Sequence, residues 1–262
     1  MDHTTGPDDG PLPNRVVEAA AQRRLGSHRA TYVPIPPSPA AHRSDRIVLS
    51  VFFALLVSAG IALAPTSPAL GVFCIAPITV LVVSRLVREN RIRRTRKDAG
   101  LHLYEHGLVV AAGRRLRTLR WDAMTVYQNI GRYHTFGRST RIKHAYTLRD
   151  DDGREVTVRE GFPNAEEWGP RIQQAVADAQ LTDAINALRA GRTLPFGCFR
   201  LSRNDLEAGG RRVTWSQGKG VGTRQGLVSV EVAGRRAGLS GDPVRMFPKL
   251  RLFTSLVEQL RS

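Results

Sequence analysis

Hydrophobic residues are concentrated in two long runs, Ile47–Ala64 and Leu70–Val87. A link from Pro65 to Ala69 separates the two runs and is too short to fold as a domain. A helix needs roughly 20 apolar residues to cross a bilayer core about 30 Å thick, and each run approaches that length once its flanks are included. The pattern predicts a transmembrane helical hairpin over residues 46–88.

Basic residues follow the predicted hairpin closely and also precede it, at Arg43 and Arg46. Because Lys and Arg near the ends of spans stay on the cytoplasmic side, we expect a multi-pass protein of the cell membrane with both termini in the cytoplasm. In the basic juxtamembrane segment 89–100, the cations either only fix this topology or also bind anionic lipid headgroups, each contributing roughly 1 kcal/mol. The candidate lipid-contact residues are Arg88, Arg91, Arg93, Arg94, Arg96 and Lys97.

Residues 1–45 have the pattern of a flexible cytoplasmic segment with one short helix. The helix is expected to begin at Asn14, which can cap it, and to end before Gly26. Its apolar face lies either on the membrane surface or on the folded part of the chain. The prolines in Tyr32–Pro39 exclude a helix there and predict an extended linker.

Beyond residue 100, apolar and polar positions alternate in short segments that are punctuated by Gly or by Asp-Gly. This pattern predicts antiparallel strands. The segments are His102–Val110, Arg115–Asn129, Arg141–Asp150 and Glu155–Glu160. The period then becomes helical, with Trp168 and Ile172 on one face, and a second short helix is predicted from Asp183 to Ala190.

The same succession occurs a second time before the C-terminus, where short strands precede a terminal helix. The strands are Phe199–Ala208, Arg211–Trp215, Leu227–Ala233 and Arg235–Ser240. In both copies a Gly-Arg-Arg turn leads into a strand that ends at Trp, over Gly113–Trp121 and Gly210–Trp215. We therefore predict two repeated units, 101–190 and 191–262, in which both Trp side chains are buried.

Strands closed by a single C-terminal helix resemble the plan of the pleckstrin-homology-like (PH-like) superfold. Over roughly residues 100–260 the chain also looks like an actinobacterial family of membrane proteins of unknown function. The segments that carry this likeness are Leu103–Val110, Arg120–Asp122, Val126–Gln128 and Trp168–Pro170. The resemblance implies an α+β membrane protein, with a two-helix transmembrane hairpin followed by two tandem PH-like units, and implies no catalytic residue. Only the Gly-rich Gln217–Gly222 departs from the expected strand, because glycine pairs poorly within a sheet.

The chain has a formal net charge of +16, a value found in many proteins that bind nucleic acid. Nearly half of the excess lies in residues 46–97, around the predicted hairpin. Most of the basic residues are Arg, a usage that GC-rich coding produces without selection for a polyanion. We therefore do not expect nucleic acid as a partner, and a membrane-tethered nucleic-acid-binding protein is the alternative function.

No residue pattern predicts catalysis, a cofactor or a metal site. Gly218–Gly222 lacks the Gly-Lys-Ser/Thr of a phosphate-binding loop, and Asp150–Gly153 lacks the later Glu of a calcium loop. His102 and His106 have the spacing of metal ligands on a helix, but in a strand this spacing separates them by roughly 13 Å. We expect a non-enzymatic membrane protein whose PH-like units recognise a lipid headgroup, a peptide or a protein partner at the bilayer.

Overall fold

The structure is a computed structural model that describes residues 12–34, Ser58, Ser84, 99–113, 115–135, 138–159, 162–234 and 238–261. The chain divides into two compact units. One comprises Met1–Val33, Gly100–Ala111 and Leu116–Ser262, and the other comprises Pro34–Ala99 with Ala112–Arg115. The helices and strands described below lie in the first unit, except for the facing ends of two strands.

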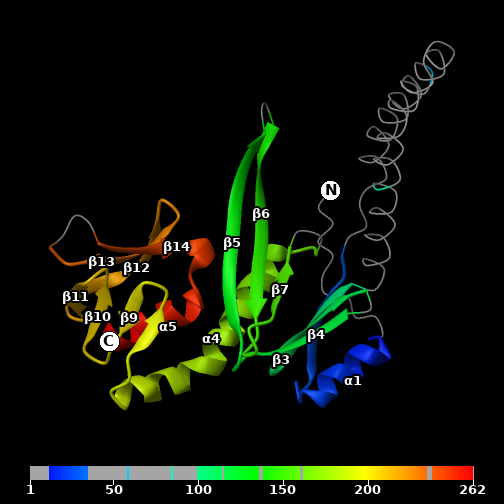
Figure 1. Cartoon of the computed structure of the whole chain (residues 1–262), viewed down its shortest axis with the longest axis horizontal. Coiled ribbons are helices and arrows are strands. Elements are labelled where there is room, and N and C mark those ends of the chain that lie inside the picture. The colour runs from blue at the N-terminus through cyan, green and yellow to red at the C-terminus, as the bar shows by residue number, and fades with distance from the viewer. Residues whose placement is uncertain are drawn as a thin grey trace, which may run out of the picture. The chain divides into compact units, whose positions relative to one another are not determined.

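Four strands form the first sheet, in the order β1-β2-β3-β4 (Figure 1). They are β1 (His28–Tyr32), β2 (Gly100–Tyr104), β3 (Gly107–Ala112) and β4 (Arg115–Arg120). The pairs β1–β2 and β2–β3 are antiparallel, with Tyr32 opposite Leu101. Because side chains alternate along a strand, Leu101 and Leu103 point together into the core while His102 points to the opposite face.

A second sheet of three antiparallel strands, β5-β6-β7, packs with the first. Its strands are β5 (Thr125–Thr135), β6 (Arg138–Arg149) and β7 (Glu155–Val158), and the β5–β6 hairpin extends well past β7 (Figure 1). Helix α4 (Ala165–Arg189) completes this half and buries Trp168 edge-on against the ring of Tyr146. Both sheets and α4 share one hydrophobic core, which includes Tyr32, Leu101, Leu108, Met124, Tyr146, Leu148, Trp168 and Ile172.

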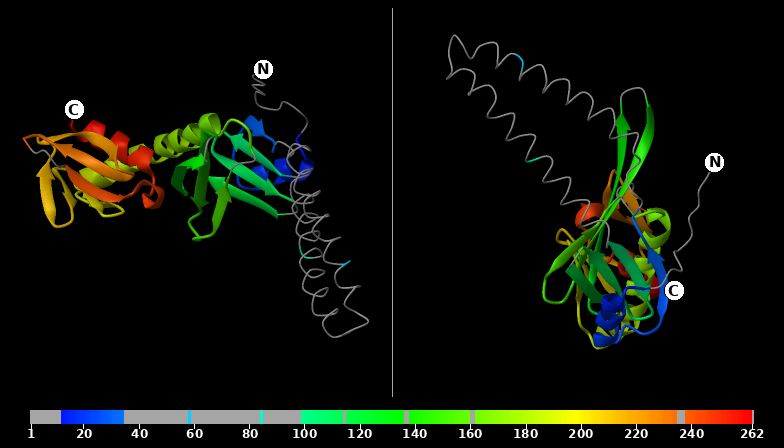
Figure 2. Two further views of the ribbon diagram at one scale, coloured as in Figure 1. Left: turned by 90° about the horizontal axis from the view of Figure 1, so that it is seen from above. Right: turned by 90° about the vertical axis from the view of Figure 1, so that its right-hand side faces the viewer.

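The second half repeats this architecture. One sheet has the order β11-β10-β9-β8 and the other the order β12-β13-β14, and helix α5 (Leu250–Arg261) closes their core. The strands are β8 (Leu194–Phe196), β9 (Phe199–Leu201), β10 (Asp205–Ala208), β11 (Arg211–Thr214), β12 (Gly218–Arg224), β13 (Leu227–Val232) and β14 (Leu239–Pro243). A 3-10 turn, η1 (Val244–Met246), precedes α5, while α4 leads from one half to the other (Figure 2).

The two predicted Trp residues occupy the same place in each half. The indole Nε1 of Trp121 donates to the carbonyl oxygens of Tyr104 and Glu105, at 3.2 and 3.1 Å. The indole Nε1 of Trp215 donates to the oxygens of Ser202 and Arg203, at 3.3 and 3.0 Å. In each half, the two carbonyls lie at the turn between the second and third strands of the four-stranded sheet, β2–β3 or β9–β10. Burial of Trp121 is confirmed, whereas Trp215 is only partly buried.

A second signature of the repeat stands at the start of each closing helix. Phe162-Pro163-Asn164 precedes α4 and Phe247-Pro248-Lys249 precedes α5, and the last residue of each triplet has a positive φ, 56° and 50° respectively. In each case an aromatic residue four positions later donates its amide to that residue, Trp168 to Asn164 at 3.1 Å and Phe253 to Lys249 at 3.0 Å. The sequence interpretation did not use this motif.

The halves differ most in the connection between their first two strands. In the second half β8 and β9 are joined by Gly197-Cys198, and Phe196 pairs with Phe199. In the first half the equivalent strands β1 and β2 are separated by residues 33–99 of the sequence, although Tyr32 and Leu101 are still paired. The long segment is therefore an insertion into a β-hairpin, and β1 belongs to the first repeat. The sequence had placed Tyr32 in an extended linker outside that unit.

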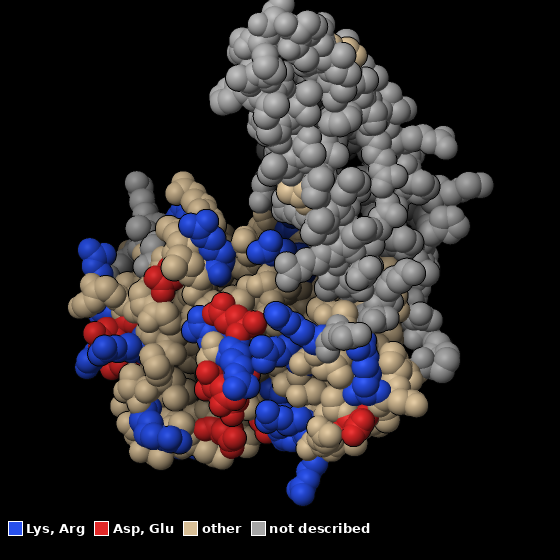
Figure 3. Space-filling view, turned by 45° about the vertical axis from the view of Figure 1, so that its right-hand side comes forward, with Lys and Arg blue, Asp and Glu red and all other residues tan. Residues whose placement is uncertain are grey.

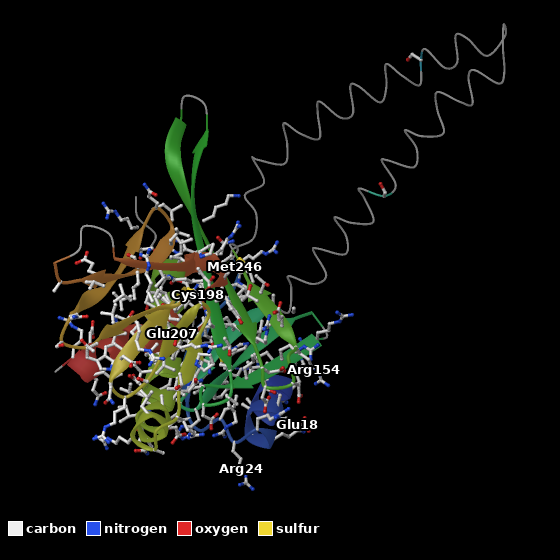
Figure 4. All side chains as sticks on the ribbon, turned by 60° about the vertical axis from the view of Figure 1, so that its left-hand side comes forward. Glu18, Arg24, Arg154, Cys198, Glu207 and Met246 are labelled. Carbon is white, nitrogen blue, oxygen red and sulfur yellow. The ribbon has the colours of Figure 1, made fainter. Side chains whose placement is uncertain are left out.

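Helix α1 (Asn14–Gln22) packs on the outer face of the first sheet. Its buried residues Val16 and Ala20, with Leu25 beyond its end, contact Tyr104 and Val109. Glu18 and Arg24 are exposed and project away from the sheet (Figure 4). This contact settles the choice left open by the sequence, because the apolar face of the helix covers the folded domain.

The predicted fold class requires correction. Within the described residues, no helix is long and apolar enough to cross a membrane. Helices α1 and α5 are shorter than the roughly 20 residues that a span requires, and α4 carries charged residues along its length. This finding contradicts the predicted α+β membrane protein with a transmembrane hairpin and the predicted multi-pass location in the cell membrane. The described chain is mostly antiparallel sheet. The predicted hairpin, 46–88, lies outside the described residues apart from Ser58 and Ser84.

One local prediction is wrong, and the doubt about one strand is resolved. The predicted break before Asp183 is absent, because α4 continues through Thr182 and is held on the core by Gln180, whose Nε2 donates to the oxygens of Trp121 and Met124. The Gly-rich segment pairs with β13 as strand β12, with a register shift between Gly218 and Gly220. Backbone pairing needs no side chain, so a bulge accommodates these glycines at the sheet edge.

Candidate binding surfaces

An open cavity of about 440 Å³ lies on the side of the β5-β6-β7 sheet that faces away from the core. Described residues of the three strands, and Arg159 directly after β7, line it. Cross-strand pairs position its lining: Gly131 faces Lys143, Asn129 faces Ala145, and Thr147 faces Thr157. The lining residues are Asn129, Gly131, Lys143, His144, Ala145, Thr147, Thr157 and Arg159. We call this cavity the outer-face pocket.

Polar donors dominate the outer-face pocket. The hydroxyls of Thr147 and Thr157 lie 3.2 Å apart, and the exposed side chains of Lys143 and Arg159 supply two cations. Its described lining contains no carboxylate. Gly131 and Ala145 have little or no side chain, so they leave space between the longer side chains that line the pocket. Ammonium, guanidinium and hydroxyl groups in this arrangement suit an anionic ligand with several acceptor oxygens.

Arg149 and Glu155, on the same face of the sheet, form an ion pair. Glu155 accepts hydrogen bonds from the guanidinium of Arg149, with a distance of 2.8 Å to its Nε, and the pair holds the pKa of Arg149 above its usual value. The Arg149 guanidinium also lies over the ring of Tyr127, 5.2 Å from its centroid. The one acidic side chain of the β7 strand is thus engaged away from the pocket.

A second surface of interest is the edge of β5 that does not pair with β6. A segment of the second half covers this edge. Pro248 forms an antiparallel bridge with Tyr127, and the amide of Lys249 donates to the carbonyl oxygen of Val126 at 2.9 Å. Burial at this junction lowers the pKa of the Lys249 ammonium. The segment Phe247-Pro248-Lys249 therefore adds to the β5 edge as a short extra strand.

Two side-chain contacts lie beside this junction, one within the first half and one between α4 and α5. Gln173 Nε2 on α4 donates to Gln128 Oε1 on β5 at 2.6 Å. Arg251 Nε on α5 donates to Gln174 Oε1 on α4 at 2.8 Å. The η1 turn runs along β5, with exposed Met246 near the foot of the β5–β6 hairpin (Figure 4).

The His pair considered in the sequence analysis does not form a ligand pair. His102 is buried on β2, and its Nδ1 lies 2.9 Å from Thr31 Oγ1, which is also 2.8 Å from Nε2 of His28. Burial, reinforced by nearby His28, lowers the pKa of His102 to about 4. His106 lies in the exposed turn after β2.

The acidic run of the sequence forms a turn. Carboxylate oxygens of Asp150, Asp151 and Asp152 lie within 4.8 Å of one another. Asp150 Oδ1 accepts from the amide of Arg154 at 2.7 Å, and the Arg154 guanidinium is 3.6 Å from Asp152. These bonds close the β6–β7 turn, as the Asp-Gly signal predicted. Gly218–Gly222, which lack the signature of a phosphate-binding loop, lie in strand β12.

The predicted lipid-contact residues lie outside the described part of the chain, and their role stays a prediction. They are Arg88, Arg91, Arg93, Arg94, Arg96 and Lys97. On the face shown in Figure 3, basic and acidic side chains are interleaved and do not gather into one continuous basic patch.

The pocket residues were missed because their side chains are separated by many positions along the sequence. Lys143, Ala145 and Thr147 alternate on one face of β6, which the period-two pattern contains. Their neighbours on β5 and β7 follow only from the register.

Comparison with curated proteins gave no match. A family model described as a family of unknown function, DUF6585, matches residues 12–262. The match begins ahead of α1 and includes both repeats, so the repeated architecture lies within one family region. A family without assigned function agrees with the resemblance drawn from the sequence. The chain belongs to the DUF6585 family.

Proposed function

We propose that the protein is a non-enzymatic recognition protein built of two PH-like modules, and that its first module binds a phosphate-type anion in the outer-face pocket. The observation that carries this proposal is the gathering of Lys143, Arg159 and the Thr147–Thr157 hydroxyls around one cavity without a carboxylate among its described lining. The four-strand sheet, three-strand sheet and closing helix of each half support the PH-like assignment.

The chemistry favours phosphate over a simple carboxylate. A phosphate group offers at least three acceptor oxygens, which suits two cations and two hydroxyl groups that line one cavity from β6, β7 and the residue after β7. Hydrogen bonds that involve an ionised group are about twice as strong as neutral ones, so the two cations should supply most of the affinity. Because both are exposed, binding should weaken as salt rises.

The test is calorimetric titration of the full chain with inorganic phosphate and with inositol hexakisphosphate. The double variant Lys143→Gln/Arg159→Gln should weaken binding at least about tenfold, or ~1.4 kcal/mol. A matched control, Arg200→Gln/Arg211→Gln, removes the same charge from exposed positions of β9 and β11 and should bind as the parent does.

Sedimentation with vesicles separates the two sources of such a group. Vesicles of phosphatidylcholine with phosphatidylinositol bisphosphate test for a lipid headgroup, with pure phosphatidylcholine as the blank. Binding to these vesicles and loss in the double variant indicate a lipid ligand, whereas binding of the soluble phosphates alone indicates a soluble one. No binding in either assay, or equal losses in the pocket and control variants, contradicts the proposal.

A further inference from the structure

The two halves use their equivalent sheet edges differently. The edge of β5 is covered within the chain, where Lys249 donates to Val126 and Pro248 bridges to Tyr127. Strand β12 is the equivalent edge strand of the second half. No described residue forms a bridge or a printed backbone hydrogen bond with the outward side of β12 between Val221 and Thr223.

The register identifies the equivalent backbone position. Val126 is paired with Leu148 and followed by the Tyr127–Thr147 pair, and Val221 is paired with Val230 and followed by the Gly222–Ser229 pair. Val126 comes five residues after Trp121, and Val221 comes six residues after Trp215. The bulge at Gly218/Gly220 accounts for the extra residue. Both valines come after the Trp that follows the fourth strand of their own half, and they lie at corresponding positions.

Hydrogen bonding determines which way the backbone amide and carbonyl of Val221 point. Gly222 is paired with Ser229 of β13. Its carbonyl oxygen faces β13, since it accepts a hydrogen bond from Ser229 Oγ at 3.3 Å. Successive residues of an antiparallel strand alternate between turning their amide and carbonyl toward one neighbour and toward the other. The amide and carbonyl of Val221 therefore point away from β13, as the Val126 carbonyl points away from β6 to accept from Lys249.

Helix α5 contacts β12, but the space above the glycines of this strand is open. A Cβ added to Gly222 would meet Ser229 Oγ only at 3.9 Å, and one added to Gly220 would meet the flexible end of Arg261 at 3.7 Å. Arg224, at the end of β12, and Arg261 are exposed and give the edge a positive border. Glu231, which pairs with Gly220, lies one strand further in.

We propose that the edge of β12 binds an extended acidic peptide segment of a partner protein, which adds to the β12-β13-β14 sheet as a fourth strand. Backbone hydrogen bonds at Val221 supply the affinity, and Arg224 and Arg261 select acidic side chains on the added strand. The chain already contains this mode of contact, because Phe247-Pro248-Lys249 adds to the corresponding edge of β5. The site is separate from the outer-face pocket, so each can be tested without the other.

The probe is a fluorescein-labelled peptide, Thr-Glu-Val-Thr-Val-Glu-Val-Thr-Glu, titrated against the full chain by fluorescence anisotropy. Val221→Pro removes the outward amide, and proline is tolerated at such edge positions because the neighbouring strand does not use that amide. Val221→Thr keeps the amide and is the matched control. The peptide should bind the parent and Val221→Thr equally, and bind Val221→Pro at least about tenfold more weakly.

Two further arms keep the test decisive if Val221→Pro does not fold. A peptide N-methylated at every residue has no backbone amide to donate from either edge and should lose binding to the parent protein. In Arg224→Glu/Arg261→Glu the preference should reverse toward a peptide with Lys in place of Glu. Absence of binding to the parent up to about 1 mM, undiminished binding of the N-methylated peptide, or equal binding of acidic and basic peptides to the parent would overturn the proposal.

Discussion

At the scale of single residues, His102 makes the stability of the first half depend on pH. Its burial keeps the imidazole neutral, with a pKa of about 4 in the folded chain against 6.5 in the unfolded one. The unfolded chain therefore takes up a proton as pH falls below about 6.5, while the folded chain does not do so until about 4. The contribution of His102 to the free energy of unfolding is fully present above pH 6.5. It is lost as pH falls from 6.5 to about 4, by up to about 3 kcal/mol.

This dependence is measured by urea unfolding of the parent and of His102→Gln across the same pH range. The free energy of unfolding of the parent should fall more steeply toward pH 4 than that of the variant. His106→Gln, in the exposed turn, serves as the control and should keep the parent slope. Equal slopes for the parent and His102→Gln would show that the buried imidazole is not the group responsible.

The two equivalent Trp residues should differ in their contribution to stability. Trp121 is 5 % exposed and Trp215 is only partly buried, although each indole makes the same pair of hydrogen bonds. Replacing Trp121 by Phe should cost about 2–4 kcal/mol, through lost packing and two unsatisfied carbonyls, and replacing Trp215 about 1–2 kcal/mol. Thermal or urea unfolding measures both, and a larger cost at Trp215 would be the contrary result.

At the scale of the elements, α4 is held by a close approach to β6. A Cβ on Gly169 would overlap the buried ring of Tyr146, which packs against Trp168. Gly169→Ala should therefore destabilise the protein by about 1–3 kcal/mol, even though the same change on an exposed helix face is stabilising by up to about 1 kcal/mol. Glu166→Ala, on the exposed side of the same helix, is the control and should stay within about 0.5 kcal/mol. A neutral or stabilising Gly169→Ala would contradict this packing.

Elements whose signals are local could be predicted from the sequence. Alternation and turn residues located most strands after residue 100, and the Gly-Arg-Arg and Trp pattern identified the repeat. Strand β1 was missed because its partner β2 follows after a long insertion, and pairing over such a separation leaves no local pattern. Strand β12 was doubted because glycine carries little propensity, yet its pairing depends on the backbone and on Val221 opposite Val230.

For the molecule as a whole, the sequence could predict the repetition but not how the halves connect. The junction depends on the amide of Lys249 and the carbonyl of Val126, which lie far apart in the sequence and carry no side-chain signal. The outer-face pocket has the same origin, because Lys143, Thr157 and Arg159 come together only through the register of β6 and β7. The proposed binding site therefore depends on non-local arrangements and not on a short sequence motif.

The central claim is that the first half binds a phosphate-type anion in the outer-face pocket, and the most direct measurement is a backbone NMR titration of the full chain with inorganic phosphate. The account predicts that the largest saturable shifts occur at Asn129, Lys143, Thr147, Thr157 and Arg159. Amides of the β8–β11 sheet should stay unchanged throughout. Shifts that are largest in the second half, or that never saturate and spread over all exposed basic residues, would contradict the account.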